Sequence, residues 1–273
     1  MLKKIGRLDA ESKKELDTII DSIYELLDKG KSSKAEKELI KLSATPNYFI
    51  REYVGKDLIN YEDQKQVNPI ANRMIKHKIY GVRATALFYY YQKYFDDPDS
   101  MFEILSESFE SVPWEVESII NEMWKRFPDF MKDKMTDWLE SDNPKKRALS
   151  FHGMENIANS DPGFIMDFIS KAIDDDTMEV QKKITHILTQ VARANPVIVF
   201  PYIREWLCEA NDKRIKTIWV SMKKLANIVI QRNRREKSQE FVLLTQQTIY
   251  DWTKDENDNV AKMGEKLSHI IKK

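Results

Sequence analysis

The sequence predicts an all-α fold built from repeated pairs of antiparallel helices. Glycine is scarce, with 7 residues among 273, and proline is modest at 9. Few helix breakers and many straight-chain side chains favour helix over sheet. Apolar residues recur at helical spacing, and proline-containing turns return at a fixed interval. Together these observations predict about six or seven helical pairs, each packed on its neighbours.

The apolar periodicity is clearest in three segments. In each, apolar residues recur after three, four and seven positions, which places them on one face of a helix. The segments are Leu16, Ile19, Ile20, Ile23 and Leu27; Val116, Ile119, Ile120 and Met123; and Val180, Ile184, Ile187, Leu188 and Val191. Asp9 predicts the start of the first helix, and Gly30 predicts its end.

Three proline dipeptides define the register of the repeat. Phe127-Pro128, Asp161-Pro162 and Asn195-Pro196 stand 34 residues apart. Proline suits the first turn of a helix because it loses no hydrogen bond there. Each dipeptide begins an apolar helix that ends in a polar turn: Ser141-Asp142-Asn143, Asp174-Asp175-Asp176 and Ala210-Asn211-Asp212. A second helix after each turn predicts an α-α superhelix, a HEAT-like repeat solenoid.

We expect a single domain over residues 1–273, because repeats that pack only on their neighbours escape the size limit of one core. The unit returns more loosely after Lys78, at Asp97-Pro98 and before Val260. Residues 1–62 and the stretch 231–237 fit the period least well.

Composition and motifs exclude several classes of protein. One cysteine, Cys208, cannot form a disulfide within the chain, and we expect a buried thiol. We find no signal peptide and no apolar run near the ~20 residues of a membrane span, so we expect a cytoplasmic protein and no membrane partner. The four histidines show no ligand spacing, and no phosphate-loop, HExxH or GxSxG motif occurs. We therefore expect no metal and no cofactor. We also expect a monomer.

Charge is unevenly distributed. Residues 1–144 carry 22 Lys+Arg and 27 Asp+Glu, whereas residues 145–273 carry 22 and 17. Basic residues recur where the second helices begin: Lys145, Lys146, Arg147, Lys182, Lys183, Lys213, Arg214 and Lys216. Equivalent positions align in a solenoid, so we expect a basic ridge, which the run Arg232, Arg234, Arg235 and Lys237 and the pair Lys262 and Lys266 would extend. A DNA backbone is the commonest partner, although a solvated helix face or an acidic protein partner fits the same pattern.

One cluster carries candidate chemistry. Trp114, Glu117 and Asn121 lie on one helix, off its apolar stripe. His186 lies among lysines on the polar face of its own helix, and Arg147 begins the helix between them. An aromatic ring, a carboxylate and a cation in one groove would hold a nucleotide. The alternatives are a tryptophan covering the core edge, a surface ion pair and a solvated histidine.

These segments resemble the bacterial DNA alkylation repair HEAT-repeat family, the AlkD-like DNA glycosylases, over residues 75–225. The segments that carry the resemblance are Trp114-Glu115-Val116-Glu117-Ser118-Ile119, Trp138 to Pro144 with Arg147-Ala148, Val180 to Ile184, and Asn195 to Ile203. The resemblance implies a double-stranded DNA partner. It also implies a DNA-3-methyladenine or 7-methylguanine glycosylase, which hydrolyses the N-glycosidic bond of a cationic alkylated purine.

The resemblance assigns roles to four residues. Glu117 falls where the family has its catalytic aspartate, and Arg147 fits the family's arginine if one gap is allowed. Trp114 lies near the first tryptophan, shifted by one residue, and His186 takes the place of the second. Because of these departures, three interpretations stay open: an active glycosylase, a non-catalytic protein that binds DNA structures, and a protein–protein interaction scaffold.

Overall fold

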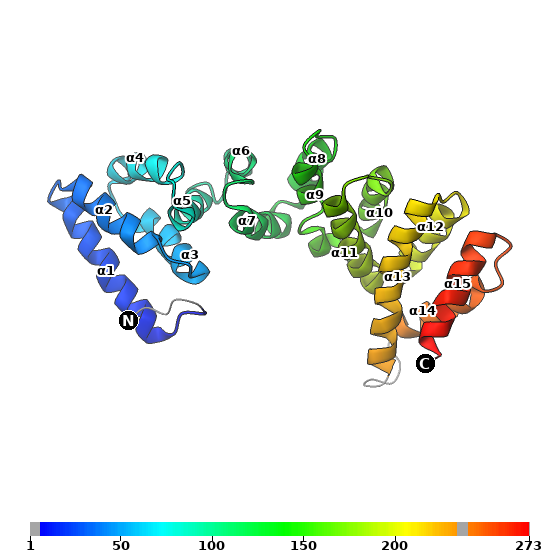
Figure 1. Cartoon of the computed structure of the whole chain (residues 1–273). Helices are drawn as coiled ribbons and strands as arrows, with labels where there is room; N and C mark the ends of the chain where they lie inside the picture. The colour runs from blue at the N-terminus through cyan, green and yellow to red at the C-terminus, as the bar shows by residue number, and fades with distance from the viewer. Residues whose placement is uncertain (1–5, 234–239, 273) are drawn as a thin grey trace. The chain divides into compact units, whose positions relative to one another are not determined.

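The computed structural model describes residues 6–233 and 240–272. Over these residues all regular structure is helical, with fifteen α-helices, two short 3-10 helices and no strand (Figure 1). The predicted all-α fold of packed helical pairs is confirmed. No described helix combines the length and the apolar character that a membrane crossing requires.

Contacts group the chain into two compact units, Met1–Ile119 and Ile120–Lys273. Each unit is described by itself below. The expectation of one domain over residues 1–273 stays a prediction.

The first unit is built around one buried helix. Its elements are α1 (Ala10–Asp28), α2 (Ser32–Ser43), α3 (Tyr48–Asp57), η1 (Leu58–Asn60), α4 (Gln64–Met74), α5 (Tyr80–Lys93), α6 (Pro98–Ser108) and the start of α7 (Pro113–Arg126). Helix α5 packs on α2, α3, α4 and α6. Nearly every residue from Gly81 to Tyr91 is buried, which is the pattern of a helix with neighbours all round.

The expected boundaries in this unit follow from capping. The Asp9 side chain accepts a hydrogen bond from the Ser12 amide at 2.9 Å, and Gly30 follows α1 with a φ of 67°. The Asp97 side chain caps α6 in the same way through the Ser100 amide at 3.1 Å. The predicted starts of both helices are confirmed.

The second unit keeps the predicted register. Its remaining elements are α8 (Pro128–Leu139), α9 (Pro144–Ser150), η2 (Met154–Ile157), α10 (Pro162–Ala172), α11 (Met178–Ala194), α12 (Pro196–Cys208), α13 (Asp212–Asn233), α14 (Glu240–Trp252) and α15 (Asp258–Ile271). The three prolines of the 34-residue repeat are the first residues of α8, α10 and α12. Cys208, expected to be buried, is partly exposed because it ends α12 at a turn.

The helices of this unit pack in two ways. Within pairs, α8 packs on α9, α10 on α11, α12 on α13 and α14 on α15. Between pairs, the second helices pack in succession, α9 on α11, α11 on α13 and α13 on α15. Side chains on the open face of α9, α11, α13 and α15 are therefore brought side by side.

One hydrogen bond recurs at the start of four helices. The fourth residues of α3, α5, α9 and α11 each donate a side-chain hydrogen bond to the carbonyl six residues earlier. The bonds run from Arg51 to Thr45 (3.0 Å), Arg83 to His77 (2.7 Å), Arg147 to Ser141 (2.9 Å) and Gln181 to Asp175 (2.8 Å). The turn before each helix is thereby fixed to the helix that follows it.

Helices α3 and α5 approach closely at Gly55. A Cβ atom added to Gly55 would lie 2.7 Å from Phe88 Cβ, with the Thr85 carbonyl oxygen nearer still. We expect Gly55→Ala to lower the free energy of unfolding by about 1–3 kcal/mol, because the added methyl forces the two helices apart. Urea unfolding followed by circular dichroism measures this difference.

The matched control is Gly163→Ala in α10, where the nearest heavy atom to an added Cβ is 4.0 Å away. This change should be neutral or slightly stabilising, since alanine is the better helix former. Equal destabilisation by both substitutions would contradict the close approach of α3 and α5.

Candidate nucleic-acid interface

The first turn of α7 presents two of the predicted site residues. Trp114 is 72 % exposed, a large value for an indole, and Glu117 is partly exposed. The apolar stripe of the same helix is buried, as predicted, from Val116 to Met123. Trp114 and Glu117 thus lie off the stripe, where a partner molecule can reach them.

Glu115, which stands between Trp114 and Glu117 in the sequence, is completely buried. Glu115 Oε1 accepts a hydrogen bond and ion pair from Arg51 Nη2 at 2.6 Å, and its Oε2 accepts one from the Tyr80 hydroxyl at 2.5 Å. The guanidinium carbon atoms of Arg51 and Arg83 lie 5.6 and 5.8 Å from the centroid of the Tyr80 ring. Burial raises the pKa of Tyr80, and its hydrogen bond to Glu115 raises it further. The cluster fixes the first turn of α7 to α3 and α5.

Sequence reasoning missed Glu115, although a signal was present. Glu115 stands one helical turn before Ile119, so it falls on the edge of the predicted apolar stripe. A charge on a buried face requires a partner. That partner, Arg51, is 64 residues away in the chain, and no spacing rule connects the two.

Arg147 is engaged by the turns around it. Its Nε donates to Asp175 Oδ2 at 2.8 Å, and its Nη1 donates to the carbonyl oxygens of Ser141 and Asp142 at 2.9 and 3.1 Å. Its Nη2 donates to the Thr177 hydroxyl at 3.2 Å. A phosphate at Arg147 would have to share these donors. Arg147 and the exposed His186 belong to the second unit, whereas Trp114 and Glu117 belong to the first.

Two more cations of the predicted ridge are paired with aspartates of the same turn. Lys213 Nζ pairs with Asp176 and also donates to the Asp174 carbonyl at 2.6 Å. Arg214 binds the Asp174 carboxylate through two nitrogens, at 3.1 and 2.5 Å, and this holds the pKa of Asp174 below its usual value. With Arg147 on Asp175, three successive aspartates neutralise three basic residues.

Four lysines line an open groove between α11 and α13. The groove has a volume of about 430 Å³ and is lined by Lys182, Lys213, Lys216 and Lys224. Exposed apolar side chains, Met178 at 70 % and Val220 at 39 %, lie among them. Lys224 was not among the predicted residues, although it follows Lys216 by eight positions and so shares its helical face.

A second groove, of about 350 Å³, continues this surface between α13 and α15. It is lined by Lys216, Trp219, Lys262 and Lys266, so Lys216 belongs to both grooves. We define the basic surface as Lys182, Lys213, Lys216, Lys224, Lys262 and Lys266. The proposed extension through Arg234, Arg235 and Lys237, and the side chain of Arg232, lie outside the described residues.

The remaining predicted basic residues have other surroundings. Lys146 Nζ lies 5.9 Å from the centroid of the Trp138 ring, and Lys183 Nζ lies 3.1 Å from His152 Nδ1. Lys145 is exposed on α9. None of the three lines the two grooves. Within residues 6–233 and 240–272, no group of three metal-ligating side chains occurs.

The fold and this surface define an all-α helical-repeat protein with cationic grooves between its second helices. The sequence matches the family described as DNA alkylation repair enzyme over residues 44–225, which is more than half of the chain. The protein therefore belongs to the DNA alkylation repair enzyme family, as the sequence resemblance indicated. The matched range contains Trp114, Glu117, Arg147 and His186, and also Lys182 and Lys216 of the basic surface.

Other similarities are distant. No curated protein matches the sequence significantly. Two solved structures, both crystal structures of engineered proteins from the Northeast Structural Genomics Consortium, are similar to this chain. The first is 12 % identical to this chain with a TM-score of 0.38, and the match covers 95 % of this chain and 71 % of the engineered protein. The second is 13 % identical with a TM-score of 0.27, and the match covers 93 % of this chain and 96 % of the engineered protein.

The buried ion pair of Arg51 and Glu115 leads to a prediction about stability. Arg51→Met keeps most of the side-chain volume but leaves Glu115 buried without its cation. We expect a loss of about 3–5 kcal/mol in the free energy of unfolding, since an uncompensated buried charge is costly. Chemical denaturation measures it.

Arg73→Met is the control, because it breaks the exposed pair of Arg73 with Glu36, whose nitrogen and oxygen are 2.8 Å apart. The expected loss is about 0–1 kcal/mol, the usual range for surface ion pairs. Similar losses for both variants would show that the buried Arg51–Glu115 pair contributes no more to the free energy of unfolding than a surface ion pair does.

Proposed function

We propose that this protein binds duplex DNA through the basic surface and excises cationic alkylated purines from it. The observation that carries the DNA proposal is the groove between α11 and α13. There Lys182, Lys216 and Lys224 converge, and none of them has an ion pair or side-chain hydrogen bond within the described residues. Membership of the DNA alkylation repair enzyme family supports the same proposal.

The groove suits a nucleic-acid backbone for two reasons. Unpaired ammonium groups can replace the counterions that surround phosphates, and this release of counterions drives binding at low salt. The exposed side chains of Met178 and Val220 offer apolar contact to sugars, which a purely ionic surface would lack. Lys213 is already paired with Asp176 and contributes less.

The proposed reaction is hydrolysis of the N-glycosidic bond. An N3- or N7-alkylated purine is cationic, so it leaves as a neutral base with the bonding electron pair. Water adds to C1′ of the oxocarbenium-like sugar and loses a proton. Glu117 would stabilise the positive sugar or position this water, Trp114 would pack on the sugar-phosphate, and Arg147 would hold a phosphate. The exposure of Trp114 and Glu117 on one helical turn supports contact with a large substrate.

A non-catalytic DNA-binding role is the second candidate. His186 stands where the resembling family has an aromatic ring, and Arg147 already donates four hydrogen bonds to the turns around it. Both observations leave the DNA surface intact while weakening the catalytic site. A protein–protein scaffold would bind no DNA at all.

The DNA surface is tested by replacing Lys182, Lys216 and Lys224 together with alanine. We expect affinity for a short duplex to fall, and the slope of log K against log salt to become shallower by up to about 0.9 per lost phosphate contact. Fluorescence anisotropy across a salt series measures both. Replacing the exposed Lys34, Lys37 and Lys41 of α2 removes the same charge and should change little. Equal losses would indicate a general charge effect, and no affinity in the native protein would favour the scaffold.

The catalytic step is tested by release of 7-methylguanine or 3-methyladenine from methylated duplex DNA. We expect Glu117→Gln to lower the rate by about 100-fold, the usual effect of removing one stabilising group, while DNA affinity is retained. Glu122→Gln on the same helix is the control, because Glu122 pairs with Lys125 at 2.6 Å. DNA binding without any release by the native protein would leave the non-catalytic role.

A further inference from the structure

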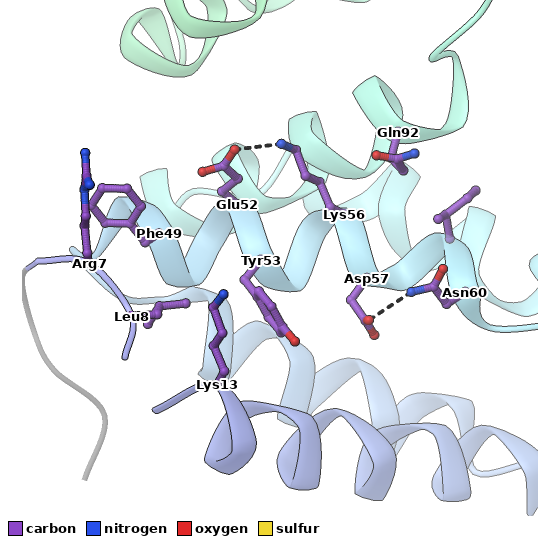
Figure 2. Close-up of a pocket in the computed structure, with 11 residues that line it drawn as sticks. Arg7, Leu8, Lys13, Phe49, Glu52, Tyr53, Lys56, Asp57, Asn60 and Gln92 are labelled. Atoms are coloured by element: carbon purple, nitrogen blue, oxygen red, sulfur yellow. Dashed lines mark hydrogen bonds and ion pairs between the residues drawn. The ribbon is translucent and has the colours of Figure 1, made fainter. Parts of the chain in front are cut away.

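The first unit contains a pocket of about 610 Å³ that the DNA proposal does not use (Figure 2). One wall is a single face of α3, formed by Phe49, Glu52, Tyr53, Lys56 and Asp57. The opposite wall carries Lys13 from the first turn of α1, and Figure 2 shows its amine pointing toward α3. The volume is that of a site for a small molecule.

A short strap before α1 closes one end of the pocket. The Gly6 carbonyl accepts a hydrogen bond at 3.1 Å from the side-chain amide of Asn47, which is 1 % exposed. Asp9 caps α1, and Leu8 packs on the hydrophobic core. With both ends of the strap anchored, Arg7 is held at the mouth of the pocket, where it lies beside the Phe49 ring (Figure 2).

Some charged side chains of the pocket have hydrogen-bonding or ion-pair partners, and others have none within the described residues. Lys56 pairs with Glu52 at 2.7 Å, and the Asp57 carboxylate accepts hydrogen bonds from Tyr24 at 2.8 Å and Asn60 at 3.0 Å. In contrast, the side chains of Arg7 and Lys13 have no ion pair or hydrogen bond within the described residues. The unsatisfied groups are therefore both cations, and they lie at the end that holds Phe49.

We propose that this pocket binds a 5′-mononucleotide, either free or as the phosphorylated end of a DNA strand. The phosphate binds Arg7 and Lys13, because guanidinium and ammonium groups form strong charge-assisted hydrogen bonds with phosphate oxygens. The base packs on Phe49, as nucleobases do on aromatic rings in single-strand sites. Glu52, Lys56 and Asp57 lie further along the same face of α3 and together carry a formal charge of −1, which favours a monophosphate over a longer phosphate chain.

The test is calorimetric titration of the full chain with 2′-deoxyadenosine 5′-monophosphate at low salt. Binding should be at least about tenfold tighter than for deoxyadenosine or inorganic phosphate, since each lacks one half of the recognised chemistry. Replacing Arg7 and Lys13 together with alanine should weaken binding by about tenfold or more. Phe49→Leu should weaken it several-fold through loss of stacking.

Two controls separate this site from the rest of the molecule. The double variant Lys14→Ala and Lys34→Ala removes two exposed lysines that do not line the pocket and should leave affinity unchanged. The triple alanine variant of Lys182, Lys216 and Lys224 should also bind the mononucleotide normally, even though its duplex binding is impaired. Loss of mononucleotide binding in that triple variant would assign the ligand to the basic surface and overturn the proposal.

The two sources of the ligand are separated with single-stranded oligonucleotides in the triple variant. Tighter binding of a 5′-phosphorylated strand than of its 5′-hydroxyl form, dependent on Arg7 and Lys13, supports a strand end. Binding of the free mononucleotide alone supports a metabolite. No saturable binding at millimolar concentration, or binding indifferent to the Arg7 and Lys13 changes, overturns the proposal.

Discussion

The hydrogen bond from the fourth residue of a helix to the carbonyl six residues earlier organises much of this protein. In the second unit it couples two of the turns to the next repeat, because Arg147 also reaches Asp175 and Gln181 accepts from Thr217. In the first unit Arg51 uses the same bond to hold Thr45 while a second nitrogen binds Glu115. One position in the repeat thus satisfies carbonyl groups of the turn and also joins neighbouring helices.

This arrangement divides the basic residues into two groups. Some lie at helix starts close to turn aspartates and are used internally, as Arg147 and Arg214 are. Others face the grooves instead, both near a helix start, as Lys182 does, and further along a helix, as Lys224 does. The ion pairs of Arg147 and Arg214 therefore serve to join neighbouring repeats. The charge available to a polyanion lies on the lysines that line the two grooves.

The sequence was a good guide wherever the relevant information was local. Proline register, helix caps and apolar stripes are set by residues within a few positions, and each was predicted correctly. The pairing of charges was not predictable, because Arg147 meets Asp175 across 28 residues and Arg214 meets Asp174 across 40. Spacing indicated that Arg147, Lys213 and Arg214 lie near one surface, but only the fold shows that acids of one turn neutralise them. Glu115 was missed for the same reason.

The pairing of three turn aspartates with cations has an evolutionary consequence. Asp174 with Arg214, Asp175 with Arg147, and Asp255 with Arg204 are pairs in which at least one partner is substantially buried. A change in either member alone leaves a charge with reduced access to water, which is costly. The two members of such a pair should therefore change together among relatives. Lys182 and Lys216 have no such internal partner among the described residues, so only the ligand should constrain them. Correlated change would then mark the joints between repeats, and independent change would mark the binding face.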